Sequence, residues 1–274
     1  MTQYTNILFI GDIVGKPGRK VIADKLPGLK DKYNLDFVVA NAENSAGGFG
    51  ITQKIVRELF EYGVDVITLG DHTFDKAADA EEILSTNHKV LRPYNYPRGT
   101  KGKGFHIYTT DKGVRIAVCN MLGRIFMTSI VDCPFQATKA IQREYRMGED
   151  YDVMIVDNHV EASSEAVCLG ELWDGKASLV GGSHTHIPTA DAFIKPRGTL
   201  YQTDTGMTGV YNTSLGCEFA GPMKQFEVGV RQRKVLASGE GTLCGLYAKV
   251  DNETGKCVEF KIIRTGGVLP DTEV

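Results

Sequence analysis

Short apolar runs that end in polar residues recur along the chain. The first covers residues 6–10 and stops at Gly11 and Asp12, and the second covers residues 36–40 and enters a glycine-rich loop at 41–48. Continuous apolar runs of this length are typical of buried strands. Three more runs follow the same pattern, at residues 64–69, 152–156 and 178–181.

Helical spacing of apolar residues lies between the early runs. Residues 18–32 show this spacing, and Pro27 is expected to break or kink the helix. Thr52 can cap a second helix that continues to about Tyr62, because its side chain can accept a hydrogen bond from the first turn. Further helices are predicted near residues 76–85 and 135–147.

The second half of the chain is richer in strand-like runs. Residues 104–110 and 114–120 read as a pair of strands. Early strands alternate with helices and later strands do not, which predicts an α/β fold whose sheet is partly antiparallel. No repeat, low-complexity tract or linker divides the chain, so a single domain over residues 1–274 is expected. The predicted tail strands are 199–204, 225–231, 243–250 and 257–263, with a hairpin loop between the last two.

Residues able to bind metal follow five of the predicted strands. In open α/β sheets, ligand sites gather at the carboxyl ends of the strands, so these residues are expected to meet in one crevice. Imidazole and carboxylate ligands without a thiolate suit iron, manganese or zinc. The candidate ligands are Asp12, Glu43, Asp71, His159, His184 and His186.

Single members of this set also have structural interpretations. Asp12 can be a turn or helix cap, and His159 can be a hydrogen-bonded core histidine. His184 and His186 carry the strongest local signal. The glycine pair at 181–182 is expected to let the loop turn sharply enough for both imidazoles to face one cavity.

Composition and charge are those of a globular protein and give no strong signal for a nucleic-acid or membrane partner. The apolar fraction of 42% and charged fraction of 24% are ordinary for a globular protein. The formal net charge of −3 gives no strong signal for nucleic acid, although bound metals would add positive charge for a small anionic substrate. The amino terminus lacks a signal-peptide pattern, and no apolar run approaches the ~18 residues of a membrane helix, so no membrane partner is expected. The six cysteines show no paired spacing, which predicts reduced thiols in a cytoplasmic protein.

Several longer motifs match a known family. Gly-Asp at 11–12, Asn-Ala-Glu-Asn at 41–44, Gly-Asp-His at 70–72 and Gly-Ser-His-Thr-His at 182–186 resemble the calcineurin-like metallophosphoesterases. The chain is similar in particular to the YmdB-type bacterial phosphodiesterase branch, over about residues 6–265. That closer similarity rests on Gly-Asp-Ile-Val-Gly-Lys-Pro-Gly-Arg at 11–19, Arg-Pro-x-Asn-Tyr-Pro at 92–97 and Thr-Asp-x-Gly-Met-Thr-Gly at 203–209.

The resemblance implies a fold and a chemistry. The fold would be a four-layer α/β/β/α sandwich with mixed sheets and a site for two metal ions, with iron expected first and manganese or zinc as alternatives. The activity would be hydrolysis of cyclic nucleotides, 2′,3′-cyclic first and 3′,5′-cyclic second, by attack of a metal-bound hydroxide. Carried over by position, one metal would be held by Asp12, Glu43, Asn44 and His186, and the other by Glu43, Asp71, His159 and His184, with Glu43 bridging.

Further roles follow from the same motifs. His72 matches the family's proton donor, which would protonate the leaving ribose oxygen. Asp75 can either orient His72 or cap the helix predicted at 76–85. Asn44 can bind metal or phosphate, or form an Asx-turn within its loop. Substrate-binding residues are unassigned; the aromatics considered for stacking on a base are Phe49, Phe126 and Tyr211, each of which also has a structural interpretation.

Asp71 departs from the family pattern, which usually reads Gly-Asn-His at this place. The additional negative charge is expected to hold the metal more tightly and to make it a weaker Lewis acid. Two alternatives therefore remain open, namely a metal-binding regulatory protein with little turnover and a metal hydrolase acting on a different ester or amide. Assembly into a homo-oligomer is also left open.

Overall fold

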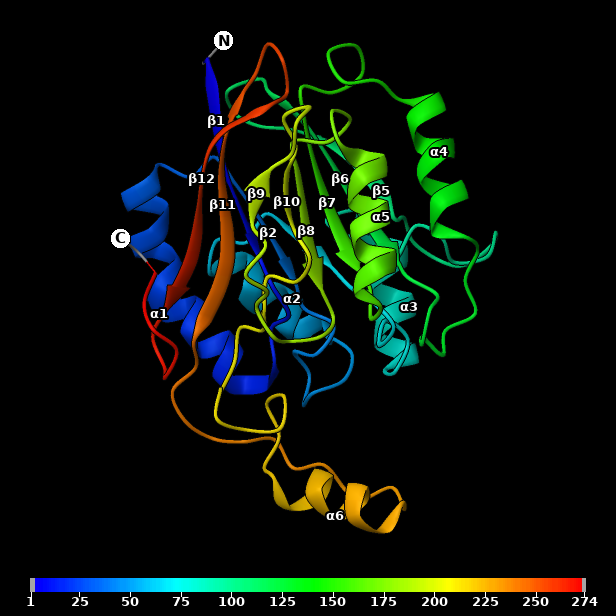
Figure 1. Cartoon of the computed structure of the whole chain (residues 1–274), viewed down its shortest axis with the longest axis vertical. Helices are drawn as coiled ribbons and strands as arrows, with labels where there is room; N and C mark the ends of the chain where they lie inside the picture. The colour runs from blue at the N-terminus through cyan, green and yellow to red at the C-terminus, as the bar shows by residue number, and fades with distance from the viewer. Residues whose placement is uncertain (1–2, 273–274) are drawn as a thin grey trace.

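The computed structural model describes residues 3–272 and contains two six-stranded sheets that pack face to face (Figure 1). The strands of the first sheet are β1 (Tyr4–Ile10), β2 (Phe37–Asn41), β3 (Val66–Thr68), β4 (Val90–Leu91), β11 (Leu243–Asp251) and β12 (Cys257–Thr265). Their order is β12-β11-β1-β2-β3-β4. Strands β1 to β4 run parallel, and β11 is antiparallel to both of its neighbours.

The second sheet has a parallel centre and antiparallel edges. Its strands are β5 (Phe105–Thr109), β6 (Arg115–Leu122), β7 (Val153–His159), β8 (Leu179–Ser183), β9 (Phe193–Ile194) and β10 (Leu200–Gln202). Their order is β5-β6-β7-β8-β10-β9, and only β5 and β9 run against the others. Both sheets are therefore mixed, as expected.

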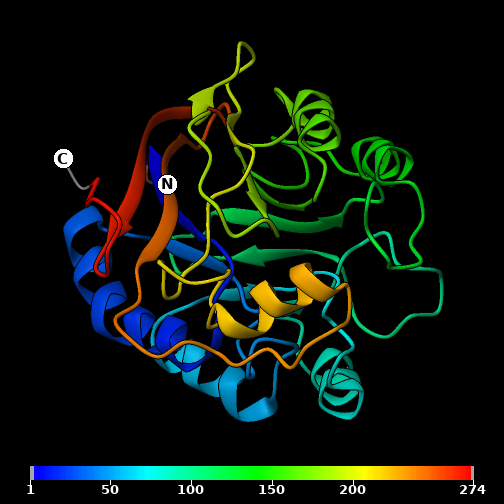
Figure 2. The ribbon, with the colours of Figure 1, turned by 60° about the horizontal axis from the view of Figure 1, so that its bottom comes forward.

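Helices cover the outer face of each sheet (Figures 1 and 2). The helices beside the first sheet are α1 (Gly15–Tyr33), α2 (Gln53–Glu61) and α3 (Ala77–Thr86), and those beside the second are α4 (Pro134–Glu144) and α5 (Ser163–Trp173). A sixth helix, α6 (Ala220–Val228), lies apart from these layers, beyond the edge where β1 and β7 end (Figure 1). No helix within residues 3–272 is long and apolar enough to cross a membrane.

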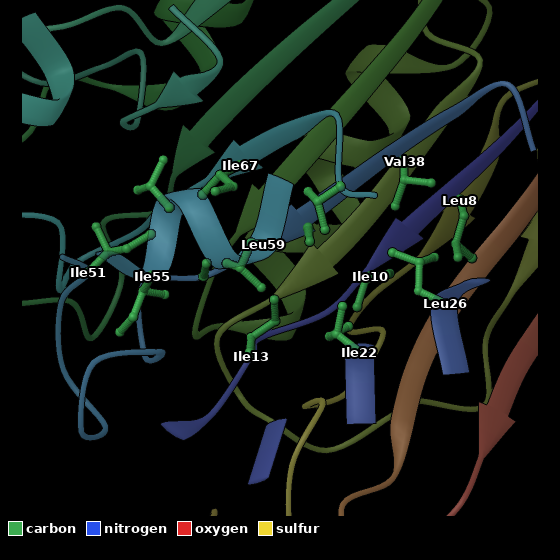
Figure 3. Packing of buried hydrophobic residues seen from close by; sticks show 14 of the residues in the cluster. Leu8, Ile10, Ile13, Ile22, Leu26, Val38, Ile51, Ile55, Leu59 and Ile67 are labelled. Atoms are coloured by element: carbon green, nitrogen blue, oxygen red, sulfur yellow. The ribbon is translucent and has the colours of Figure 1, made fainter. Parts of the chain in front are cut away.

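Three apolar layers hold these four layers together. Figure 3 shows the first, in which strand residues such as Leu8 and Val38 meet helix residues such as Leu26 and Leu59. The second layer, which includes Phe9, lies between the sheets, and the third packs the outer face of the second sheet against α4 and α5. Burial of both faces explains why the strands read as continuous apolar runs. The four-layer α/β/β/α sandwich is confirmed.

Pro27 does not break α1, so the break is excluded from the two predicted outcomes, a break or a kink. The helix runs unbroken from Gly15 to Tyr33 with Pro27 inside it. Leu26 and Leu29 lie on either side of the proline, and both are buried. Burial of apolar side chains on both turns compensates for the backbone hydrogen bond that proline cannot donate.

The predicted strand at 225–231 is also wrong, because α6 covers most of it. The apolar residues of this segment alternate, but the segment has no neighbouring strand. Two local signals favour a helix here, namely Pro222 near its start and Gly229 at its end, where the glycine adopts a φ of 69°. Helix α5 was not predicted, although Ala166, Leu169 and Trp173 have helical spacing and are buried.

Candidate metal centre

The proposed ligands gather at one edge of the sandwich, and each sheet supplies a different chemical type. Asp12, Glu43 and Asp71 follow β1, β2 and β3 of the first sheet. His159 is the last residue of β7 in the second sheet, and His184 directly follows β8. Parallel strands end at the same edge, so packing the sheets face to face brings carboxylates and imidazoles together.

Four of these side chains form one tight cluster. His159 Nε2 lies 3.1 Å from Glu43 Oε1 and 3.1 Å from Asp71 Oδ1. His184 Nδ1 lies 3.2 Å from Asp71 Oδ1 and 3.1 Å from His159 Nε2. Donor atoms bound about 2.1 Å from one ion lie about 3.0–3.4 Å apart at octahedral or tetrahedral angles. The spacing of Glu43, Asp71, His159 and His184 therefore fits a single metal ion.

Asp12, Asn44 and His186 form a second, looser group of side chains. His186 Nε2 lies 3.3 Å from Asn44 Oδ1 and 4.0 Å from Asp12 Oδ1. Asp12 Oδ2 accepts a hydrogen bond from the His184 backbone N–H at 3.0 Å, but Asp12 Oδ1 is buried without a hydrogen-bond partner among residues 3–272. A buried carboxylate oxygen without a partner is unfavourable, and a cation held with His186 and Asn44 would satisfy it.

Negative charge is concentrated in this centre. Within the described part of the chain, every ion pair of Asp12, Glu43 and Asp71 is made with a histidine and none with lysine or arginine. Burial raises the pKa of Asp12 and lowers the pKa of His186 to about 4. Against the effect of burial, Glu43 and Asp71 raise the pKa of His159, and Asp71 raises the pKa of His184, so protonated imidazoles balance the carboxylates in the metal-free centre. Divalent metal ions would take over this positive charge when they bind.

A buried network behind His159 fixes which ring nitrogen faces the cluster. Ser183 Oγ donates to Asp157 Oδ1 at 2.5 Å, so Ser183 can accept from His159 Nδ1, which lies 2.8 Å away. Thr68 and Asn41 also donate to Asp157. This arrangement directs His159 Nε2 toward Glu43 and Asp71, where it donates a hydrogen bond when protonated and would offer its lone pair to a bound metal ion. Asp157 was not among the predicted site residues, although it lies two residues before His159 and thus on the same face of β7.

The imidazole ring of His184 is turned the opposite way from that of His159. Its Nδ1 faces the cluster, whereas its Nε2 lies 3.0 Å from Glu161 Oε2. A carboxylate on the outer nitrogen of a metal-binding histidine fixes the tautomer and makes the inner nitrogen more basic. Glu161 is a second residue that the sequence analysis missed, because nothing in its local sequence connects it with His184.

The glycine pair before His184 has a different role from the one predicted. Gly181 and Gly182 belong to β8, and the turn is made by His184 and His186 themselves, with φ of 103° and 67°. A Cβ on Gly181 would lie 2.4 Å from the Phe9 ring, and a Cβ on Gly182 would lie 1.7 Å from the Thr203 carbonyl oxygen. These glycines are needed for close packing rather than for backbone freedom.

His72 lies at the exposed side of the cluster. Its backbone N–H donates to Glu43 Oε2 at 2.8 Å, and its Nε2 lies 3.8 Å from Asp71 Oδ2. Its Nδ1 lies 2.8 Å from Asp75 Oδ2, whereas α3 is capped at Lys76 without a side-chain hydrogen bond. The helix-cap alternative for Asp75 is therefore wrong, and Asp75 contacts His72 instead. Asn44 does not form the alternative Asx-turn, because the Ala46 N–H donates to Gly50 O. Its Nδ2 donates to Gly48 O, and its Oδ1 lies 3.3 Å from His186 Nε2.

A cavity of about 360 Å³ opens in front of the cluster, and Glu43, Asn44, His72, Glu161, His184 and His186 line one side of it. Of the three aromatic candidates for base stacking, only Phe49 lines this cavity. Phe126 is 83% exposed elsewhere on the surface. Tyr211 is buried, and its hydroxyl donates to the backbone oxygens of Met207 and His186, which is a structural role.

Comparisons with known proteins agree with this architecture. The chain is 41% identical over 257 residues to the 2′,3′-cyclic-nucleotide 2′-phosphodiesterase of Bacillus subtilis, covering 94% of this chain and 96% of that protein. A crystal structure described as a novel phosphatase from Mycoplasma pneumoniae superposes with a TM-score of 0.90 at 31% identity, covering 97% of this chain and 95% of that one. The calcineurin-like phosphoesterase YfkN from Bacillus subtilis matches at a TM-score of 0.55 and 12% identity, covering 96% and 90% of the two chains, a likeness of fold alone.

Two packed mixed sheets with a histidine and carboxylate cluster at their shared edge define the calcineurin-like phosphoesterase fold. The profile of the YmdB-like protein family matches residues 8–263. With this match and the 41% identical relative, the chain belongs to the YmdB-like family.

Proposed function

We propose that this protein is a metal-dependent phosphodiesterase that hydrolyses 2′,3′-cyclic nucleotides, with 3′,5′-cyclic nucleotides as a second substrate class. The observation that carries the proposal is the cluster of Glu43, Asp71, His159 and His184 at the bottom of an open cavity. The name of the Bacillus subtilis relative supports the choice of substrate.

The ligand assignment follows the two groups of side chains. Asp12, Asn44 and His186 would hold one ion and Asp71, His159 and His184 the other, with Glu43 shared, because Glu43 belongs to the cluster and its loop carries Asn44. Imidazole and carboxylate donors suit iron, manganese or zinc, and the family resemblance favours iron among them. Such ions would polarise the phosphoryl oxygens and make a bound water more acidic.

The remaining chemistry is assigned to the protein's own residues. His72 lines the cavity with its Nε2 on the side of Asp71, where it can give a proton to the leaving ribose oxygen. Asp75 is a positioning residue, since its carboxylate holds His72 Nδ1 and thereby leaves Nε2 toward the substrate. The Glu43 carboxylate accepts from the backbone of His72, which couples the position of the proton donor to that of the shared ligand.

The test is turnover of 2′,3′-cyclic AMP, 3′,5′-cyclic AMP and bis-p-nitrophenyl phosphate by protein loaded with Mn²⁺ or Fe²⁺, with metal content measured in parallel. His72→Gln should lose turnover and keep its metal, whereas His88→Gln, a histidine outside the cavity, should behave as wild type. No turnover of any diester at full metal occupancy would sink the proposal and leave the regulatory alternative, which the additional charge of Asp71 favours.

A further inference from the structure

Residues 210–241 form a hairpin that reaches over the cavity, called the α6 hairpin below. Its base is closed by two backbone hydrogen bonds between Gly209 and Thr242, at 3.0 and 2.8 Å. A short antiparallel contact between Cys217 and Leu236 closes its neck. Beyond the neck the hairpin carries α6, which lies across the lower edge of the sandwich (Figures 1 and 2).

The α6 hairpin supplies the part of the cavity wall that the metal centre does not. Pro222, Gln225 and Phe226 of α6 line the cavity, as do Lys234 and Leu236 of the returning segment. The other side is lined by His72, His184 and His186, among others. A molecule whose phosphate sits at the metal centre would therefore have its remaining atoms against this hairpin.

Two phenylalanines from separate segments line this cavity. Phe49 comes from the loop after β2 and stands edge-on to His72, with ring centroids 4.9 Å apart. Phe226 comes from α6 and is 81% exposed although it lines the cavity. An exposed phenyl ring at the mouth of a pocket is unfavourable in water and is stabilised when a flat apolar surface covers it.

The single cation among the described residues that line this cavity favours a neutral aromatic group there over a second phosphate, whereas Lys76 and Arg231 line an adjacent hollow that shares Phe49 and His72. Lys234 lies 5.8 Å from the centre of the Phe49 ring and forms no ion pair within residues 3–272. It is the only lysine or arginine that lines this cavity within that range. One cation matches a substrate with a single phosphodiester, and stacked rings match a base, because every nucleobase has a π-face.

We propose that Phe226 and Phe49 hold the nucleobase of the substrate, so that the α6 hairpin determines the preference for nucleotides over simple phosphodiesters. This inference rests on the proposed function. Because stacking requires only a ring face, the cavity should accept all bases, with purines bound more tightly than pyrimidines.

The experiment compares a substrate that has a base with one that lacks it. The metal-loaded enzyme is assayed on 2′,3′-cyclic AMP and on methyl riboside 2′,3′-cyclic phosphate, which has the same reacting group without a base. Phe226→Ala should lower kcat/KM for 2′,3′-cyclic AMP about tenfold, mainly through KM, and leave the baseless substrate unchanged. Phe226→Trp should restore the lost activity. Phe219→Ala is the matched control, since Phe219 lies just before α6, is 48% exposed and does not line the cavity.

The outcomes separate this inference from the proposed function. An equal loss on both substrates, or an equal loss in Phe219→Ala, would overturn the base-holding role while leaving the phosphodiesterase proposal intact. If the wild type turns over neither diester, the proposed function fails, and calorimetric binding of adenosine 2′-monophosphate then decides the role of Phe226. Equal affinity of wild type and Phe226→Ala in that titration would overturn it, and about tenfold weaker binding would support it.

Discussion

The two sheets contribute opposite halves of the candidate metal centre. The first sheet supplies oxygen ligands, which are held by backbone amides: the His184 N–H donates to Asp12 and the His72 N–H to Glu43. The second sheet supplies imidazoles, which are held by carboxylates: Asp157 acts through Ser183 on His159, and Glu161 acts directly on His184. Backbone N–H donors thus orient the carboxylates, and carboxylate acceptors orient the imidazoles.

Neither half is a metal site without the other. The distances between them depend on the apolar layer between the sheets, where residues such as Phe9 and Ile155 are fully buried. Gly181 accommodates Phe9 at this layer, so a packing contact in β8 lies three residues before His184, which follows the strand. Changes in either half should therefore affect metal binding, but to different extents.

The largest loss of turnover is expected at Glu43, which follows β2 of the first sheet and is proposed to bind both metal ions. Glu43→Gln replaces the shared carboxylate by an amide, which should lower turnover by on the order of 10³-fold, because several kcal/mol of charge stabilisation is lost. Metal content and kcat measured on the same preparation check this. Glu58→Gln, at a surface ion pair with Arg19, is the matched control. Retained activity in Glu43→Gln would disprove the shared ligand.

A smaller loss of turnover is expected from Gly70→Ala, which adds a methyl group where the side chains of the two sheets meet. The Cβ of Gly70→Ala would lie 2.4 Å from His159 Nε2 and 2.5 Å from Glu43 Oε2, so both ligands must move. A misplacement of about 1 Å can reduce the rate about 10²-fold. We expect a loss of that size with reduced metal content and little change in far-ultraviolet circular dichroism. Gly28→Ala in α1, where nothing lies within 4 Å of the added Cβ, should be neutral; a normal metal content in Gly70→Ala would contradict the cluster geometry.

Glu161, the carboxylate behind the His184 imidazole, should affect metal affinity less than a direct metal ligand does. Glu161→Gln removes the charge that faces His184 Nε2. Loss of such a partner weakens metal affinity about 10–100-fold, so the variant should need more added metal to reach the wild-type rate. Titration with Mn²⁺ measures this, with Glu82→Gln on the exposed side of α3 as control. An unchanged titration curve would mean that Glu161 does not support His184.

The smallest change in rate is expected at Asp71. Asp71→Asn keeps an oxygen facing His159 and His184 but removes one negative charge. Turnover should be preserved or raised, and metal should bind less tightly. Steady-state kinetics at saturating metal test this. A large loss of activity would instead show that the site requires the carboxylate of Asp71, because both imidazoles hydrogen-bond to it.

Much of this architecture could be predicted from local sequence. The apolar runs before Asp12, Glu43 and Asp71 correspond to β1, β2 and β3, and Thr52 caps α2 as expected. These features depend on neighbouring residues only. Two expectations failed for different reasons. The predicted break at Pro27 does not occur because the sheet buries the helix residues on either side of it. Residues 225–228 are helical, as Pro222 and Gly229 favour locally, and their alternating apolar residues have no strand beside them.

By itself the sequence determined the types of the candidate ligands, their order and their places at strand ends, because strand length and polarity are local properties. Only the tertiary structure decided which ring nitrogen of His159 and His184 faces the cluster, since Asp157 and Glu161 act through space. It also placed Phe226 at the cavity, because the hairpin closes between Gly209 and Thr242, far apart in sequence. Contacts between distant segments leave no pattern in either segment alone, which is why they appear only in the folded chain.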